Sequence, residues 1–100
     1  MRYDKLVRDK IPEIIKRDGG KPITHIAGPD ELAVMLVNKL YEEVGEFSES
    51  WTLEKLADVA EVILKLSEVI GANPEQLELV RQKKVWERGG FSKNIFLEEA

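Results

Sequence analysis

Two pairs of acidic residues lie in the middle of the chain, and each pair has the spacing of one helical turn. Glu43 and Glu46 are three residues apart, and so are Asp58 and Glu61. Residues at this spacing share one face of a helix, so the carboxylates of each pair can reach a common point. Hard divalent cations such as Mg²⁺ prefer oxygen ligands of this kind. We therefore predict a Mg²⁺ site formed by Glu42, Glu43, Glu46, Asp58 and Glu61.

The helices that must position these acids can be inferred from the spacing of apolar residues. Residues 30–47 show an apolar arc at helical spacing, and Glu42, Glu43 and Glu46 fall at its border. Residues 53–70 are apolar around roughly two-thirds of the helical wheel, with Asp58 in the single polar stripe. A short connection favours an antiparallel pair, in which the acids of the two helices face each other across the seam.

Carboxylates gathered at such a seam repel one another unless a cation neutralises them. The alternative is that they are ordinary solvated surface acids, which is the usual meaning of a glutamate-rich helix. Two pairs on successive helices, one of them within a mostly apolar helix, favour the metal site.

Glycine and proline residues divide the chain into four helical segments. The expected boundaries are Pro12 and Gly19 for the first, Asp30 as N-cap and Phe47 for the second, Thr52 as N-cap and Gly71 for the third, and Asn73 and Gly89 for the fourth. Residues 23–26 are compatible with a brief strand, with residues 95–97 as its partner. We expect an all-α fold with one domain over residues 1–100, a small bundle of about four helices, with a minor two-stranded β element as an option.

Composition excludes several classes of protein. With no cysteine among its 100 residues, the chain can form neither a disulfide nor a thiolate zinc site. A net charge of −4 argues against binding to nucleic-acid polymers. No apolar run is long enough to cross a membrane, and the first residues do not have the pattern of a signal peptide, so a cytoplasmic protein is expected.

Basic residues concentrate toward the two ends of the chain, in residues 1–21 and 81–93. Basic groups facing an acidic metal site would hold an anionic ligand. The candidates are Lys5, Arg8, Lys10, Lys84 and Arg88. For bases in the last helical turn, the alternative is a simple interaction with the helix dipole.

Four stretches resemble the MazG-like all-α nucleoside triphosphate pyrophosphohydrolases, a superfamily that includes phosphoribosyl-ATP pyrophosphatase. They are EEVGE at 42–46, LADV at 56–59, YDKLVRDKIP at 3–12 and ERGGF at 87–91. The resemblance implies metal ligands at Glu43, Glu46 and Asp58, with Glu42 as a ligand or the catalytic base. The family has a fourth acid where this chain has Lys55. Glu61 is our preferred replacement, ahead of Glu54.

The resemblance also implies a reaction, namely Mg²⁺-dependent cleavage between the α- and β-phosphates of a nucleoside triphosphate, with Mn²⁺ as a substitute ion. Glu42 or Glu46 would then accept a proton from the attacking water. House-cleaning of non-standard nucleotides is one such role. The alternatives are phosphoribosyl-ATP pyrophosphatase itself and a non-enzymatic helical dimer with a regulatory or nucleotide-binding role. The broad apolar surface of residues 53–70 predicts a homodimer or higher oligomer.

Overall fold

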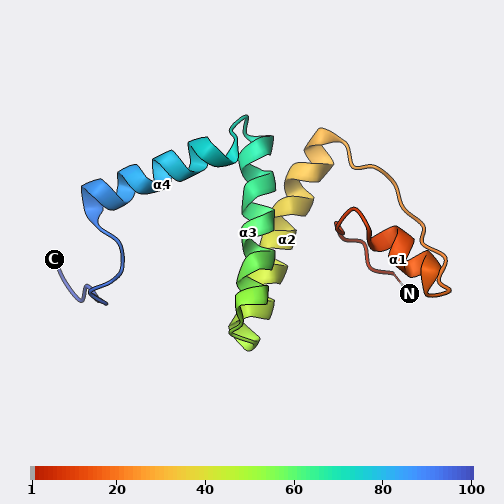
Figure 1. Cartoon of the computed structure of the whole chain (residues 1–100), viewed down its shortest axis with the longest axis horizontal. Helices are drawn as coiled ribbons and strands as arrows, with labels where there is room; N and C mark the ends of the chain where they lie inside the picture. Colours follow the sequence, from red (N-terminus) through yellow and green to blue (C-terminus); the bar gives the residue numbers. More distant parts are fainter. Residues whose placement is uncertain (1) are drawn as a thin grey trace.

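Two antiparallel helices, α2 (Pro29–Glu49) and α3 (Leu53–Val69), form the centre of the computed structural model, which describes residues 2–100 (Figure 1). Thr52 caps α3, because its Oγ1 accepts a hydrogen bond from the backbone N–H of Lys55 at 3.2 Å. α2 begins one residue before Asp30, with Gly28 at the N-cap. Asp30, which we expected at the N-cap, therefore lies in the first turn, where its charge still suits the helix dipole.

The helix α4 (Pro74–Arg88) follows α3 after a tight turn. Gly71 has a φ of 87°, in the left-handed region that glycine tolerates, and this allows the chain to leave α3. Asn73 and Gln76 then form a capping box, in which each side chain accepts a hydrogen bond from the backbone N–H of the other residue. The turn directs α4 away from the α2–α3 pair, on the side opposite α1 (Ile11–Arg17) (Figure 1).

The expectation of an all-α fold with four helices is confirmed, whereas the β element is absent. No strand forms among residues 2–100. α4 carries residues 95–97 to the far side of the molecule from residues 23–26 (Figure 1). Ile23 and Phe96 are 99% and 85% exposed, so neither segment has a face to bury. A two-stranded ribbon without such a face is at best marginally stable in water. The alternation of apolar and polar residues in residues 23–26 was therefore not enough to form a strand.

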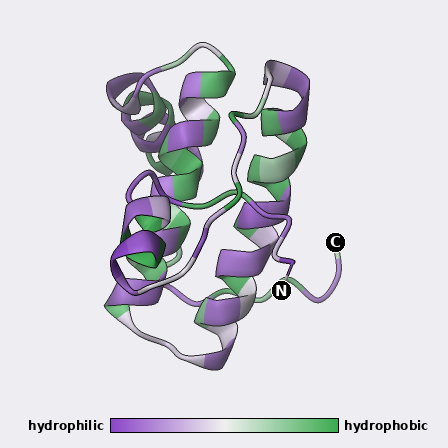
Figure 2. Cartoon of the chain, turned by 90° about the vertical axis from the view of Figure 1, so that its right-hand side faces the viewer, coloured by the Kyte–Doolittle hydropathy of each residue, from purple (hydrophilic) through white to green (hydrophobic). Residues whose placement is uncertain are grey.

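Little apolar surface is buried within one chain. Among residues 2–100, the buried apolar side chains are those of Leu36 and Val62, at 2% and 8% exposure. The radius of gyration is 17.4 Å, compared with about 13 Å for a compact chain of 100 residues. The accessible surface is 9267 Å², compared with about 5,800 Å² from the scaling for compact monomers of this mass. Apolar and polar bands alternate along the helices (Figure 2), and much of the apolar part stays exposed.

Exposed apolar side chains form a stripe along α2. The stripe contains Val34, Val37, Tyr41 and Val44. Their spacing of three and four residues places them on one face of the helix. None of the helices formed by residues 2–100 is both long enough and apolar enough to cross a membrane.

Candidate metal centre

Three acidic side chains meet across the seam between α2 and α3. Glu43 and Glu46 come from one face of α2, and Asp58 comes from the first half of α3. Each of them offers a carboxylate oxygen, and these oxygens all lie within 4.8 Å of one another. The antiparallel pairing brings Asp58 opposite the two glutamates. We call Glu43, Glu46 and Asp58 the carboxylate cluster.

Glu43 is the most deeply placed member of the cluster. The residue is 8% exposed, and its Oε2 has no hydrogen-bond partner in the part of the chain that the structure describes. Its other oxygen, Oε1, lies 3.4 Å from Nζ of Lys39. Burial raises the pKa of Glu43 above its usual value, and the negative charge of Glu46 raises it further. A buried oxygen without a partner is costly, and a cation held between the three carboxylates would satisfy it.

Every acid of the cluster, and the neighbouring Glu42, has a basic partner. Lys5 and Arg8 come from the segment before α1, Lys39 from α2 and Lys55 from α3. The pairs are Lys5 with Glu42 at 2.9 Å, Arg8 with Asp58 at 2.7 Å, Lys39 with Glu42 and Glu43 at 3.4 Å each, and Lys55 with Glu46 at 3.6 Å. The acidic residues therefore lie in an environment that is close to electrically neutral.

Glu42 lies beside the cluster and is not one of its three members. The hydrogen bond from Lys5 lowers the pKa of Glu42, and the charge of Lys39 acts in the same direction. The same hydrogen bond raises the pKa of Lys5. Glu42 is therefore held as a carboxylate, the form that a metal ligand or a proton acceptor requires.

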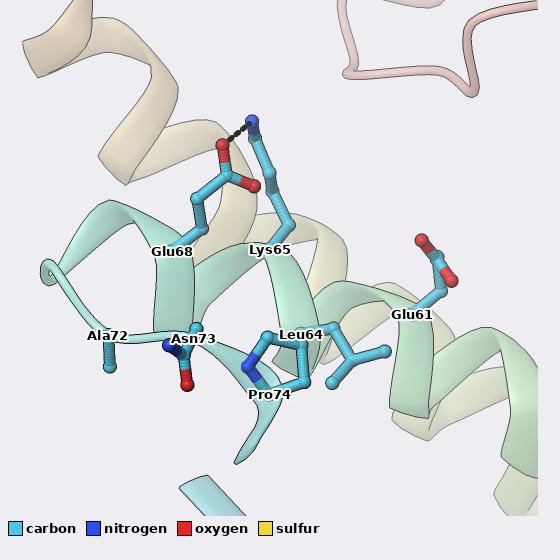
Figure 3. Close-up of a pocket in the computed structure, with 7 residues that line it drawn as sticks. All are labelled: Glu61, Leu64, Lys65, Glu68, Ala72, Asn73 and Pro74. Atoms are coloured by element: carbon cyan, nitrogen blue, oxygen red, sulfur yellow. Dashed lines mark hydrogen bonds and ion pairs between the residues drawn. The ribbon is translucent and has the colours of Figure 1, made fainter. Parts of the chain in front are cut away.

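Glu61, our preferred fourth ligand, lies outside the cluster. It is exposed and lines a shallow hollow near the turn between α3 and α4 (Figure 3). Lys65 and Glu68 form an ion pair of 3.3 Å in the same hollow. Glu54, the second choice, is not in the cluster either. Of the five residues predicted for the metal site, the structure thus groups three, and Lys55 contacts the cluster where the resemblance expects an acid.

The predicted phosphate-binding residues separate into two sets. Lys5 and Arg8 contact the acidic residues directly. Lys10 is at the N-cap of α1. Lys84 and Arg88 are on α4, which extends away from the α2–α3 pair on the other side (Figure 1). Within one chain, Arg8 therefore reaches the cluster, and Lys5 reaches Glu42 beside it.

Lys39 is the residue that sequence reasoning missed. Its side chain is only 16% exposed and bridges Glu42 and Glu43. The spacing could have identified Lys39, because it precedes Glu42 by three residues and Glu43 by four, and residues at these spacings lie on the same helical face.

Comparison of the chain with family profiles, with curated proteins and with solved structures found no match. The site is therefore described by its own geometry and by the sequence motifs.

Proposed function

We propose that this protein is a Mg²⁺-dependent nucleoside triphosphate pyrophosphohydrolase of the MazG-like kind, which cleaves between the α- and β-phosphates and releases a nucleoside monophosphate and pyrophosphate. The observation that carries the proposal is the carboxylate cluster, with the partnerless buried oxygen of Glu43 at its centre. An all-oxygen site with few ligands suits Mg²⁺, which keeps positions for water and for substrate phosphates. Mn²⁺ would be an acceptable substitute.

The cluster residues would hold the ion, and the groups around them would handle the substrate. When bound, Mg²⁺ would offset phosphate charge and lower the pKa of an attacking water. Glu46 is the more open of the two candidate bases, with 44% of its side chain exposed. Glu42 is the alternative base, held as a carboxylate by Lys5. Lys5 and Arg8 supply positive charge at the edge of the site, where the phosphate groups would lie.

Self-association is part of the proposal. The accessible surface exceeds that of a compact monomer by about 3,500 Å², whereas each partner in a standard interface buries about 800 Å². We propose that a second copy covers the α2 stripe, which places the four helices α2 and α3 of two chains side by side. This would enclose the α2–α3 pair, whose own core is small.

The test is release of pyrophosphate from a panel of standard, deoxy and damaged nucleoside triphosphates and phosphoribosyl-ATP. Each substrate is incubated with Mg²⁺, with Mn²⁺ and with chelator. Turnover of at least one substrate that stops with chelator supports the proposal, and the preferred substrate separates the house-cleaning role from the phosphoribosyl-ATP reaction. Asp58→Asn should lower turnover by about 100-fold or more, because even groups behind metal ligands contribute about 10- to 100-fold. The control is Glu49→Gln, which alters an exposed acid on α2 outside the cluster.

A second function is favoured by one specific observation. Lys55 contacts Glu46, so the chain itself places a cation beside the cluster. Because this lysine replaces an acid of the family pattern, the chain could be a non-enzymatic helical dimer that keeps the fold and acts as a regulatory or nucleotide-binding module. It would show no turnover of nucleoside triphosphates, and Glu43→Gln combined with Asp58→Asn would leave its metal affinity and its function nearly unchanged.

A further inference from the structure

The segment before α1, residues 2–10, contacts one member of the carboxylate cluster and the neighbouring Glu42. Nζ of Lys5 is 2.9 Å from Glu42, and the guanidinium of Arg8 donates a hydrogen bond of 2.7 Å to Oδ1 of Asp58. Lys39 and Lys55, in contrast, belong to the helices that carry the cluster. The N-terminal segment is therefore attached to the acidic edge by contacts that can break without unfolding α2 or α3.

Arg8 and a divalent ion would compete for one carboxylate. Asp58 is a member of the cluster, and its Oδ1 already accepts a hydrogen bond from Arg8. An ion held by the three carboxylates would bring two positive charges close to the guanidinium. Like charges at such a distance repel strongly where the surroundings are partly buried, and Glu43 shows that they are.

A count of charges leads to the same conclusion. Four carboxylates, those of Glu42 and the cluster, are balanced by four cationic side chains from lysine and arginine. Adding a divalent ion would leave an excess of two positive charges. The site can restore neutrality if basic side chains leave, or if a polyanion such as a phosphate chain arrives.

We propose that Arg8 is a displaceable counter-ion, which pairs with Asp58 in the metal-free protein and is released when a divalent cation binds. The released segment then presents Lys5 and Arg8 to the phosphate groups of the substrate. This inference depends on the metal site of the proposed function, and it adds a competition between the metal and the chain itself. Because of this competition, the metal alone binds weakly, and the metal and a phosphate anion bind cooperatively.

The first experiment measures binding of Mn²⁺ to the full-length protein by calorimetry, with and without Arg8→Gln. We expect the variant to bind Mn²⁺ about threefold more tightly, the scale of a partly exposed ion pair. Arg2→Gln is the matched control, because Arg2 pairs with Asp4, outside the cluster, and its substitution should leave the affinity unchanged. Unchanged or weaker binding by Arg8→Gln, with normal binding by the wild type, would overturn the counter-ion role while the metal site stands. Binding by the variant alone would support it, and no binding by either protein would overturn both proposals.

The second experiment follows release of the segment by limited digestion with trypsin. Cleavage after Arg8 should become faster when Mn²⁺ is added, relative to cleavage after Arg88, which is remote from the cluster. Inorganic pyrophosphate added with Mn²⁺ should slow cleavage after Arg8 again, because the segment would then hold the anion. If Mn²⁺ binds and this ratio does not change, the proposed displacement is wrong. If pyrophosphate has no effect, the phosphate-binding role of the segment is wrong.

Discussion

The guanidinium of Arg8 lies 2.7 Å from Oδ1 of Asp58, a contact between residues 50 positions apart in the sequence. It joins the basic N-terminal segment to the carboxylate cluster, whereas Lys5 of the same segment contacts Glu42 beside the cluster. The basic residues at the other end of the chain make no such link, because α4 leads them away (Figure 1). The two basic ends of the sequence are therefore not equivalent, and only the first faces the acidic centre within one chain.

The buried charge of Glu43 gives the first prediction. In the metal-free protein at neutral pH, Glu43→Gln should raise the free energy of unfolding by about 1 kcal/mol, because it removes a buried charge that has an unpartnered oxygen. The same variant should lose most of the rise in melting temperature that Mn²⁺ produces in the wild type. Both effects can be measured by thermal unfolding followed by circular dichroism.

Glu49→Gln serves as the control for this experiment, since it makes the same chemical change at an exposed position on α2. It should alter neither the stability nor the response to Mn²⁺. A Glu43→Gln protein that Mn²⁺ stabilises as strongly as the wild type would show that the metal binds elsewhere.

The raised pKa of Glu43 gives a prediction about pH. The usual carboxyl pKa of 4.5 applies to the unfolded chain, and the folded value is higher, so the folded chain binds more protons between the two values. Stability from Glu43 is therefore fully present below pH 4.5 and declines as the pH rises through the raised pKa. Glu42 acts in the opposite direction, because its lowered pKa stabilises the fold above pH 4.5, and that contribution is lost as the pH falls.

The measurement is the unfolding free energy of the wild type minus that of Glu43→Gln, over a series of pH values without metal. The difference should become more negative as the pH rises. The affinity for Mn²⁺ should increase as the pH rises and fall as the pH is lowered, because protonation of Glu43 removes a ligand. A pH-independent difference would mean that burial does not penalise the charge of Glu43.

Local signals in the sequence were sufficient to predict the helices. Thr52 and Asn73 accept hydrogen bonds from the first turns that follow them, as short side chains with free oxygens do. The N-cap of α2 was placed two residues too late, because Gly28, Pro29 and Asp30 all suit a helix start. The strand failed for a different reason, since pairing depends on a distant partner, and the direction of α4 removes that partner.

The candidate site was predictable to the extent that it follows helical spacing. Glu43 and Glu46 share a face because they are three residues apart, and the short turn brings Asp58 opposite them. Glu61 has the same spacing from Asp58, yet it lies outside the cluster. The contact of Arg8 could not be inferred, because no spacing rule relates an extended segment to a helix 50 positions away. Electrostatic partners between segments depend on the tertiary arrangement.

The capping box of α4 gives a third prediction. Asn73→Ala should lower the free energy of unfolding by about 1 kcal/mol, because the backbone N–H of Gln76 at the start of α4 loses its acceptor, Oδ1 of Asn73. Asn73→Gly should cost only a few tenths of a kcal/mol. Chemical unfolding followed by circular dichroism measures both. Equal losses in the two variants would show that the side-chain hydrogen bond, which both lack, sets the cost and that backbone conformation adds nothing.

The α2 stripe gives the last prediction, which concerns self-association. Tyr41 is 75% exposed in a single chain although it lies in the middle of an apolar row with Val37 and Val44. If a second copy covers this row, Tyr41→Lys places a charge in an apolar interface and should weaken self-association by about tenfold or more. Sedimentation equilibrium over a range of concentrations measures this directly. Ile23→Lys is the control, because Ile23 lies in the loop before α2, away from the stripe, and the change should leave the association constant as it was. A monomeric wild type would mean that the stripe has another partner, and an oligomer that Tyr41→Lys does not weaken would place the interface on a different face.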